Sequence, residues 1–310
     1  MNKIFMTLIV LMFISGCQFS GQQTIKTSGD YKKGYDGLEF KFIENQYIKE
    51  IYEITPFSFN LLLENKGAHN IENGIILMGF EDQNFRFIHS DFTNFRLEGK
   101  SIYYPKGNQK LNSYQLETKK IDEKESIERK THLYLTSCYD YSTDFSENIC
   151  IDSDIYNLKK DKSCSPNEIS LQGGQGGPIA VTKIETRMLF KSQEDTVQPQ
   201  FTLHLKNKGQ GIVINKDNIY TICSSQSIEK EELNEISLEA ELFGFDGNIQ
   251  LDCKPENPIR MKDEIATVIC TSPTRVGIDM GTYPSPLHIN IEYGYMSTIS
   301  KDITIKRAST

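Results

Sequence analysis

The sequence predicts an all-β protein made of two tandem β-sandwich domains. Three observations lead to this prediction. A strand-and-turn motif occurs twice, apolar and polar residues alternate in many short runs, and clusters of Gly, Pro, Asn and Asp separate those runs. Helical spacing of apolar residues is scarce, so we expect helices to contribute little.

The repeated motif sets the expected architecture. Residues 57–67 read FSFNLLLENKG and residues 201–209 read FTLHLKNKG, and they align on Asn-Lys-Gly at an offset of 142 residues. The apolar positions then match: Phe59, Leu61 and Leu63 correspond to Phe201, Leu203 and Leu205. A period of two places each trio on the buried face of a strand and leaves His204 facing outward. Since Asn and Gly tolerate positive φ, we expect the triplet to form the turn that ends each strand.

Further strands are expected along the rest of the chain. The candidates are residues 38–43, 74–80, 131–138, 179–190, 265–271, 287–293 and 298–306. The stretches at 79–82 and 244–247 share a Gly-Phe-acid pattern and are predicted hairpin tips. Residues 119–130 form either a short helix or a solvated loop, and residues 227–239 are an acidic insertion of the second copy.

A Gly-rich stretch marks the expected domain boundary. Residues 172–178 read QGGQGGP, which is too Gly-rich for the interior of a helix or strand. The predicted division is a first domain over 36–170, a linker over 171–178 and a second domain over 179–308. A phosphate-binding loop is disfavoured, because no Lys-Ser or Lys-Thr follows the glycines and the next residues favour a strand.

The first sixteen residues predict export. Lys3 precedes an apolar run, IFMTLIVLMFIS, from Ile4 to Ser15. As a helix this run would be about 20 Å long, shorter than the roughly 30 Å core of a bilayer. It therefore fits the hydrophobic region of a secretory signal better than a membrane span. No other apolar run approaches membrane-spanning length.

The end of that run, Ile14-Ser15-Gly16-Cys17, resembles the lipobox of prokaryotic lipoproteins. The resemblance implies a signal peptide over 1–16, cleavage before Cys17, and a lipid on that cysteine followed by a tether over 17–35. An uncleaved signal anchor is the alternative. The expected location is outside the cytoplasm, anchored to the cell membrane.

Six further cysteines are expected to form disulfides, because an even set outside the cytoplasm is typical of a disulfide framework. They are Cys138, Cys150, Cys164, Cys223, Cys253 and Cys270. Cys253 and Cys270 flank a turn-like segment and are the preferred pair. Cys138 would pair with Cys150 if the chain turns near Asp144, and Cys150 with Cys164 is nearly as plausible. Each half holds three cysteines, so complete pairing needs at least one bridge between the halves.

The sequence shows no established catalytic or metal-binding motif. Its five histidines lie far apart, and neither His-x-His nor Gly-x-Ser-x-Gly occurs. Asp152-Ser153-Asp154 offers oxygens to a calcium ion, but the rest of a calcium loop is missing. We therefore expect no catalytic residue, no metal and no cofactor. The net charge of −8 argues against a nucleic-acid partner.

Aromatic side chains are the remaining candidates for a partner surface. Tyr139, Tyr141 and Phe145 cluster near one cysteine, and Tyr293 and Tyr295 alternate near the C-terminus. On an exposed face such rings stack on sugars or anchor a protein partner. Cross-strand aromatic pairs that only stabilise a sheet are commoner, and we favour that role.

The strand followed by Asn-x-Gly resembles the CARDB and related Ig-like domains of prokaryotic surface proteins, which implies that both sandwiches are Ig-like. Other stretches are similar to uncharacterised archaeal surface proteins. These are LEGK at 97–100, the Cys-Tyr-x-Tyr-x-Thr pattern at 138–143, the Gly-rich stretch at 174–178 and Tyr-Gly-Tyr at 293–295.

Three functions are expected, in order of preference. The first is a non-catalytic, membrane-anchored surface lipoprotein that acts in adhesion, envelope organisation or assembly with a membrane complex. Its partners would be the membrane, through the lipid, and proteins of the cell envelope. The second is a lipoprotein that captures a carbohydrate or peptide in an aromatic-lined cleft between the domains. The third, an exported hydrolase, requires at least two acidic groups within about 10 Å of each other in a pocket.

Overall fold

The structure is a computed structural model that describes residues 31–43, 49–88, 92–121, 127–224, 229–244 and 247–308. Its regular structure is almost entirely β-strand, which confirms the predicted all-β sandwich class. The signal peptide, Cys17 and most of the predicted tether lie outside the described residues. Within the described ranges, no helix is both long and apolar enough to cross a membrane.

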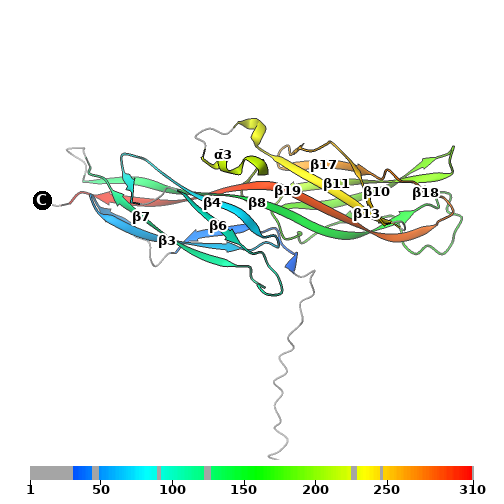
Figure 1. The fold of residues 1–310 in the computed structure, drawn as a ribbon, viewed down its shortest axis with the longest axis horizontal. Helices are drawn as coiled ribbons and strands as arrows, with labels where there is room; N and C mark the ends of the chain where they lie inside the picture. Colours follow the sequence, from blue (N-terminus) through cyan, green and yellow to red (C-terminus); the bar gives the residue numbers. More distant parts are fainter. Residues whose placement is uncertain are drawn as a thin grey trace, which may run out of the picture.

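Two strands of 25 residues run the length of the molecule. These are β8 (Glu128–Asp152) and β19 (Thr282–Lys306), which pair antiparallel over their whole length, from Glu128 opposite Lys306 to Asp152 opposite Thr282. At about 3.3 Å per residue they extend roughly 80 Å. Figure 1 shows them side by side along the long axis of an elongated body.

The long pair forms the middle of a nine-stranded sheet in the order β14-β13-β19-β8-β4-β6, to which β2, β12 and β16 add short pairings. The added strands are β2 (Glu50–Tyr52), β4 (Ile71–Phe80), β6 (Phe92–Leu97), β12 (Ile212–Ile214), β13 (Glu235–Gly244), β14 (Gly247–Gln250) and β16 (Ile259–Arg260). Strands β4 and β6 extend the sheet beside the first half of β8, and β13 and β14 extend it beside the first half of β19.

Two smaller sheets pack on opposite ends of this long sheet (Figure 1). The first has the order β1-β3-β7-β5 and consists of β1 (Leu38–Phe42), β3 (Pro56–Asn65), β7 (Gln109–Thr118) and β5 (Phe85–Phe87). The second has the order β15-β17-β11-β10-β9, with β18 also paired to β11. Its strands are β9 (Ile169–Ser170), β10 (Ile179–Lys191), β11 (Thr196–Asn207), β15 (Asp252–Lys254), β17 (Ile265–Thr271) and β18 (Val276–Gly277).

The sequence repeat is a structural repeat. The equivalent strands β3 and β11 alternate buried and less buried residues, and all six matched apolar side chains are 3% exposed or less. His204 is half-buried on the outer side of β11, where it contacts Glu185. The long strands are equivalent too, because Tyr139 and Tyr141 of β8 correspond to Tyr293 and Tyr295 of β19. Asp140 lies opposite its own counterpart, Gly294, so an approximate twofold axis relates the halves.

Several predicted elements differ from the observed ones. The predicted strands at 131–138, 287–293 and 298–306 are parts of β8 and β19, which continue through polar residues without a break. Residues 79–82 are not a hairpin tip, since the chain crosses after β4 to β5 in the other sheet. Gly244 does lie opposite Gly247 in the β13–β14 pair, but the two residues between them lie outside the described ranges.

The second copy has helical turns before and within the predicted insertion at 227–239. These are η2 (Lys216–Asn218) and α3 (Ile219–Ser224), which precede it, and η3 (Lys230–Glu232), which lies inside it, whereas residues from Glu235 onward already belong to β13. Ile219 and Ile222 of α3 are buried against Ile75 of β4, so the helix covers part of the long sheet. The first-copy segment at 119–130 has no helix among its described residues, and Glu128 already belongs to β8.

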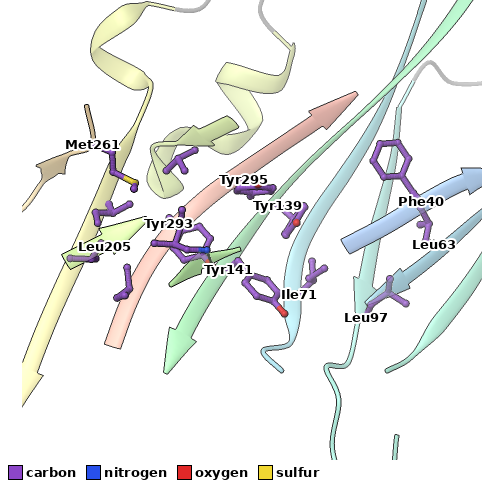
Figure 2. Close-up of a cluster of buried hydrophobic side chains, with 14 of the residues drawn as sticks. Phe40, Leu63, Ile71, Leu97, Tyr139, Tyr141, Leu205, Met261, Tyr293 and Tyr295 are labelled. Carbon is purple, nitrogen blue, oxygen red and sulfur yellow. Dashed lines mark hydrogen bonds between the residues drawn. The ribbon is translucent and has the colours of Figure 1, made fainter. Parts of the chain in front are cut away.

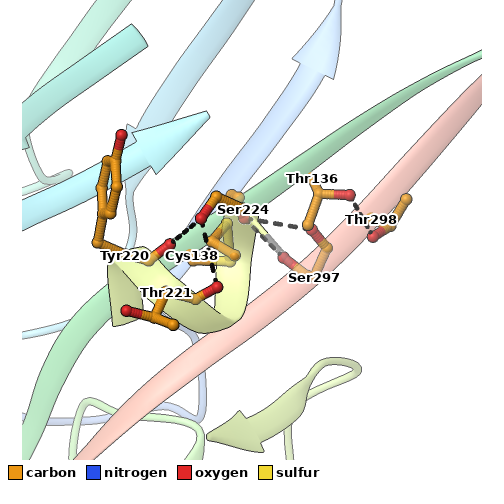
Figure 3. The surroundings of a disulfide bond; sticks show 9 residues. Thr136, Cys138, Tyr220, Thr221, Ser224, Ser297 and Thr298 are labelled. Carbon is orange, nitrogen blue, oxygen red and sulfur yellow. Dashed lines mark hydrogen bonds between the residues drawn. A yellow bond between two sulfur atoms is a disulfide. The ribbon is translucent and has the colours of Figure 1, made fainter. Parts of the chain in front are cut away.

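All six described cysteines form disulfides. Cys253–Cys270 and Cys150–Cys164 confirm two predicted pairs. The Cys138–Cys150 alternative is wrong, because β8 does not turn near Asp144 and carries both cysteines on one extended strand. Cys138 instead bonds Cys223 at the end of α3 (Figure 3). This is the bridge between the halves that the parity of the cysteines requires.

Candidate functional site at the junction of the halves

Four tyrosines meet where β8 and β19 cross the centre of the molecule. Tyr139 lies opposite Tyr295 and Tyr141 opposite Tyr293, with neighbouring ring centroids 5.7 to 6.3 Å apart (Figure 2). None of the four is more than 4% exposed, and Phe145 is 7% exposed. The suggestion that Tyr139, Tyr141 and Phe145 offer a partner surface is therefore corrected. They are core residues of the junction, in line with the sheet-stabilising role that the sequence analysis favoured.

Each tyrosine hydroxyl has a partner that is repeated in the other half. The Tyr139 and Tyr293 hydroxyls accept hydrogen bonds from the backbone N–H of Leu38 and Ile179, at 3.1 and 3.4 Å. These two residues occupy equivalent positions, each opposite the Asn of its repeat motif. Burial raises the pKa of Tyr139 and of Tyr293 well above the usual value, because it disfavours the phenolate.

The other two tyrosines hold the Asn-Lys-Gly turns. The hydroxyl of Tyr141 lies 3.3 Å from Oδ1 of Asn65, and the hydroxyl of Tyr295 lies 3.1 Å from Oδ1 of Asn207. The same Oδ1 atoms accept the backbone N–H of Gly67 and Gly209, two residues along. Each Asn side chain thus fixes its own turn and joins it to the tyrosine cluster.

This contact corrects the predicted reason for the motif. Gly67 and Gly209 do not have positive φ. A Cβ at Gly67 would lie 1.8 Å from the Tyr141 hydroxyl oxygen, and a Cβ at Gly209 would lie 2.1 Å from that of Tyr295. Glycine is required because the tyrosine approaches the backbone closely. The pairing of Asn-x-Gly with a Tyr in each half is the signal that would have revealed this.

A polar cleft of about 380 Å³ lies beside the tyrosine cluster. Its titratable lining residues come from segments far apart in the sequence: Lys32, His69, Asp144, Glu239, Glu241, His288 and Glu292. Glu241, His288 and their neighbours share one face of the long sheet, because Glu241 lies opposite His288 and Glu239 opposite Asn290. The strand register therefore brings together carboxylates that do not form a motif in the sequence.

Ion pairs occupy part of this cleft. Nε2 of His288 lies 2.7 Å from Oδ2 of Asp144, and Lys32 contacts the other oxygen of the same carboxylate. Partial burial raises the pKa of Asp144, but the hydrogen bonds from Lys32 and His288 outweigh it and hold that pKa below its usual value. Lys216 forms an ion pair with Glu292. Within the described part of the chain, Glu239 has no ion-pair partner.

Gln175 brings the Gly-rich stretch into the cleft. It is 7% exposed, and its Nε2 donates to the carbonyl of Val181 at 3.1 Å. Its Oε1 is buried and has no hydrogen-bond partner among the described residues. A buried acceptor without a partner costs free energy, so this atom lowers the stability of the fold.

The Gly-rich stretch is packed into the fold. Gly176 donates to the carbonyl of Gly34 at 2.9 Å, and its own carbonyl accepts the N–H of Ala68 at 2.8 Å. The N–H of Gly173 bonds the Tyr35 hydroxyl. These two amides are thus satisfied within the fold and do not face a phosphate. The domain boundaries at 36–170 and 179–308 stay predictions.

The Asp152–Asp154 stretch organises a loop. Asp154 accepts the backbone N–H groups of Leu158 and Lys159, both at 2.9 Å, and Asp152 pairs with Lys162 at 2.7 Å. Its three residues are buried, whereas most of the loop that follows, up to Cys164, is exposed. Within the described ranges, no group of three or more His, Cys, Asp or Glu side chains is arranged to hold a metal ion.

Comparisons with known proteins do not identify a family. No family model and no curated protein matches the chain. The chain is similar to the solved YadV chaperone, with 8% identity, a TM-score of 0.20, and 77% of this chain and 87% of the other covered. It is also similar to the secreted serine protease VesC of Vibrio cholerae, with 9% identity, a TM-score of 0.22, and 85% of this chain and 51% of that one covered. The chain is also similar to the serine-rich repeat adhesion glycoprotein Srr1 of Streptococcus agalactiae. The identity is 5% and the TM-score 0.18, and the match covers 92% of this chain and 99% of the other. TM-scores this low support no inference about function.

Proposed function

We propose that this chain is a non-catalytic surface lipoprotein, held at the membrane by a lipid on Cys17, that acts in adhesion, envelope organisation or assembly with a membrane complex. The observation that carries the proposal is the β8–β19 pair. Because both strands run unbroken from one end to the other, the two halves form one stiff body about 80 Å long. Such a body keeps partner-binding surfaces in a fixed arrangement.

The disulfides support the location. Three disulfides indicate an oxidising environment outside the cytoplasm, where such bonds form and persist. The lipid anchor is the finer part of the proposal and rests on the lipobox resemblance.

The charges of the cleft favour a non-catalytic protein. Asp144 is engaged by Lys32 and His288, and Glu292 by Lys216. The lowered pKa of Asp144 makes its carboxylate a weak base and a poor proton donor near neutral pH. The cleft does bring several acidic groups together, since Asp144, Glu239, Glu241 and Glu292 all line it, so the exported-hydrolase alternative stays a prediction.

Ligand capture is the second candidate, favoured by the cleft itself, whose lining includes Asp144, Glu239 and Glu241. The lining is polar, and the tyrosines of the junction are buried beside it, so stacking on a sugar ring is disfavoured. Since carboxylates outnumber lysines in the lining, the ligand would carry a positive charge. Thermal-shift titration with polyamines and basic peptides tests this, with Glu239→Gln expected to weaken any stabilisation.

The anchor is tested by labelling. Cells that express the full chain or its Cys17→Ala variant are given labelled palmitate, and membrane and soluble fractions are separated. We expect label and membrane association for the natural chain only. Cross-linking at the cell surface should then capture the same envelope proteins repeatedly from anchored protein and not from the variant. Equal labelling of both chains would exclude the lipid anchor.

A further inference from the structure

The connection between β6 and β7 exposes a short apolar sequence. Ile102 and Tyr103 are 67% and 88% exposed, and Tyr104 is 42% exposed. Most other large apolar side chains of the first half are buried in the core. Three consecutive exposed apolar residues are unusual for a surface that faces only water.

The fold holds this connection in a defined shape. The N–H of Tyr104 bonds Oγ of Ser101 at 3.1 Å, and the carbonyl of Tyr104 accepts the N–H groups of Ser101 and Gly107 at 3.0 and 2.9 Å. Gly107 has a φ of +84°, and a Cβ there would lie 1.7 Å from the carbonyl oxygen of Asn65. The exposure of the apolar residues is therefore fixed by hydrogen bonds and close packing.

The connection lies near the point where the chain enters the fold. The N–H of Lys100 donates to the carbonyl of Gly67 at 2.7 Å, and the next residue, Ala68, bonds Gly176. A Cβ on Gly176 would lie 3.3 Å from Cα of Lys32. Figure 1 shows the first described residues, from Tyr31, and the β6–β7 connection on the same long side of the body, and α3 on the opposite side.

The anchor can reach the same surface. Thirteen residues separate Cys17 from Tyr31, the first described residue, so the chain between them spans at most about 45 Å when extended. Tyrosine and isoleucine together suit the interface of a bilayer, since the apolar body is buried while the tyrosine hydroxyl stays hydrated. Lys100 and Lys106 flank the apolar residues, where their ammonium groups can meet lipid phosphates.

We propose that Ile102, Tyr103 and Tyr104 form a membrane-contact loop that enters the headgroup region of the bilayer holding the lipid anchor. The long axis of the body then lies along the membrane, and α3 faces away from it. This inference rests on the proposed lipid anchor, but it assigns a second point of contact that the anchor alone does not require.

Tryptophan fluorescence tests the contact. The chain contains no tryptophan, so one introduced by substitution is the only source of the signal. Full-length lipidated protein with Tyr103→Trp is reconstituted in vesicles of phosphatidylcholine and phosphatidylglycerol, with or without bromine on the acyl chains. The matched control is Tyr220→Trp. Tyr220 is 59% exposed and belongs to α3, which Figure 1 shows on the opposite side of the body. We expect a blue shift and strong quenching by brominated lipid for Tyr103→Trp, and neither for Tyr220→Trp.

Emission from Tyr103→Trp that is unshifted and unquenched would overturn the inference and leave the exposed residues for a protein partner. Equal quenching at both positions would overturn it as well. Vesicle flotation of the Cys17→Ala variant separates this outcome from the anchor. If flotation depends on Cys17 while Tyr103→Trp is unquenched, the anchor stands and the contact loop fails. If the variant floats as well as the natural chain, the anchor fails.

Discussion

Tyr295 donates a hydrogen bond to Oδ1 of Asn207 over 3.1 Å, and thereby ties the end of β11 to the centre of β19. Tyr141 and Asn65 repeat the contact in the other half at 3.3 Å. The turn motif of each half is thus fixed by a tyrosine from the long strand pair. Turn, core and junction form one interaction network, and its parts should lose stability together.

Removing the Tyr295 hydroxyl tests this network. In Tyr295→Phe the N–H of Gly211, which donates to that hydroxyl at 2.8 Å, loses its acceptor. We expect a loss of about 2 kcal/mol in the free energy of unfolding, as for a buried hydrogen bond with an orphaned donor. Urea denaturation followed by circular dichroism measures it. Tyr134→Phe, at a position 44% exposed, should change little, and a similar loss there would argue against a special role for Tyr295.

The close approach at Gly67 predicts a coupled pair of substitutions. Gly67→Ala should destabilise the protein by about 3 kcal/mol, because the new methyl group overlaps the Tyr141 hydroxyl. Adding Tyr141→Phe should recover part of that loss, so the double-mutant cycle should show coupling. Gly79→Ala is the control, since its nearest neighbour would lie 3.8 Å away. Strictly additive effects at 67 and 141 would contradict the steric explanation.

The buried tyrosines predict loss of stability in alkali. Burial raises the pKa of Tyr139 and Tyr293 in the folded state, whereas the unfolded chain ionises near pH 10. The stabilisation is therefore complete below about pH 10 and is lost as the pH rises above that value. Absorbance at 295 nm should show the exposed tyrosines titrating first and the junction tyrosines only on unfolding. Full titration of all 15 tyrosines in folded protein would disprove it.

Asp144 predicts a loss of stability in acid. Its pKa is lowered in the folded state, so its ion pairs stabilise the protein above about pH 4 and are lost as the pH falls through the lowered value. Asp144→Asn should therefore flatten the decline in urea midpoint between pH 5 and pH 3. The effect should be small, because the carboxylate is 39% exposed and water screens it.

The three disulfides should differ in their contribution. Cys138–Cys223 closes a span of 85 residues and Cys150–Cys164 one of 14. Loop-closure entropy then gives about 4.5 kcal/mol for the first and about 3 kcal/mol for the second. Paired Cys→Ala variants of each bridge, compared by urea denaturation, should show that order. Peptide mapping without reduction checks the connectivity itself, and a Cys138–Cys150 peptide would contradict it.

Features of the fold that depend on short stretches of sequence or on residue counts could be predicted. Alternation identified the buried faces of β3 and β11, and cysteine counting required a bridge between the halves. The sequence-based predictions were wrong where the same short pattern is compatible with more than one structure. A turn was considered near Asp144, but β8 continues through this residue, whose side chain lines a polar cleft.

The site was harder to predict than the fold. Lys32, Gln175, Glu239 and His288 come from four distant segments, and only the strand register brings them together. The same holds for the tyrosines. Their clustering within each half was visible, but whether the rings face the core or the solvent depends on the sheets that cover them, which no short motif encodes.

The length of the β8–β19 pair has a mechanical consequence. The two strands run in opposite directions from end to end, and their hydrogen bonds lie perpendicular to the long axis. Tension applied along that axis loads these bonds in shear, so that many must break at once rather than in sequence. A surface protein pulled lengthwise by a bound neighbour would resist through its whole centre, with no hinge at which the halves part.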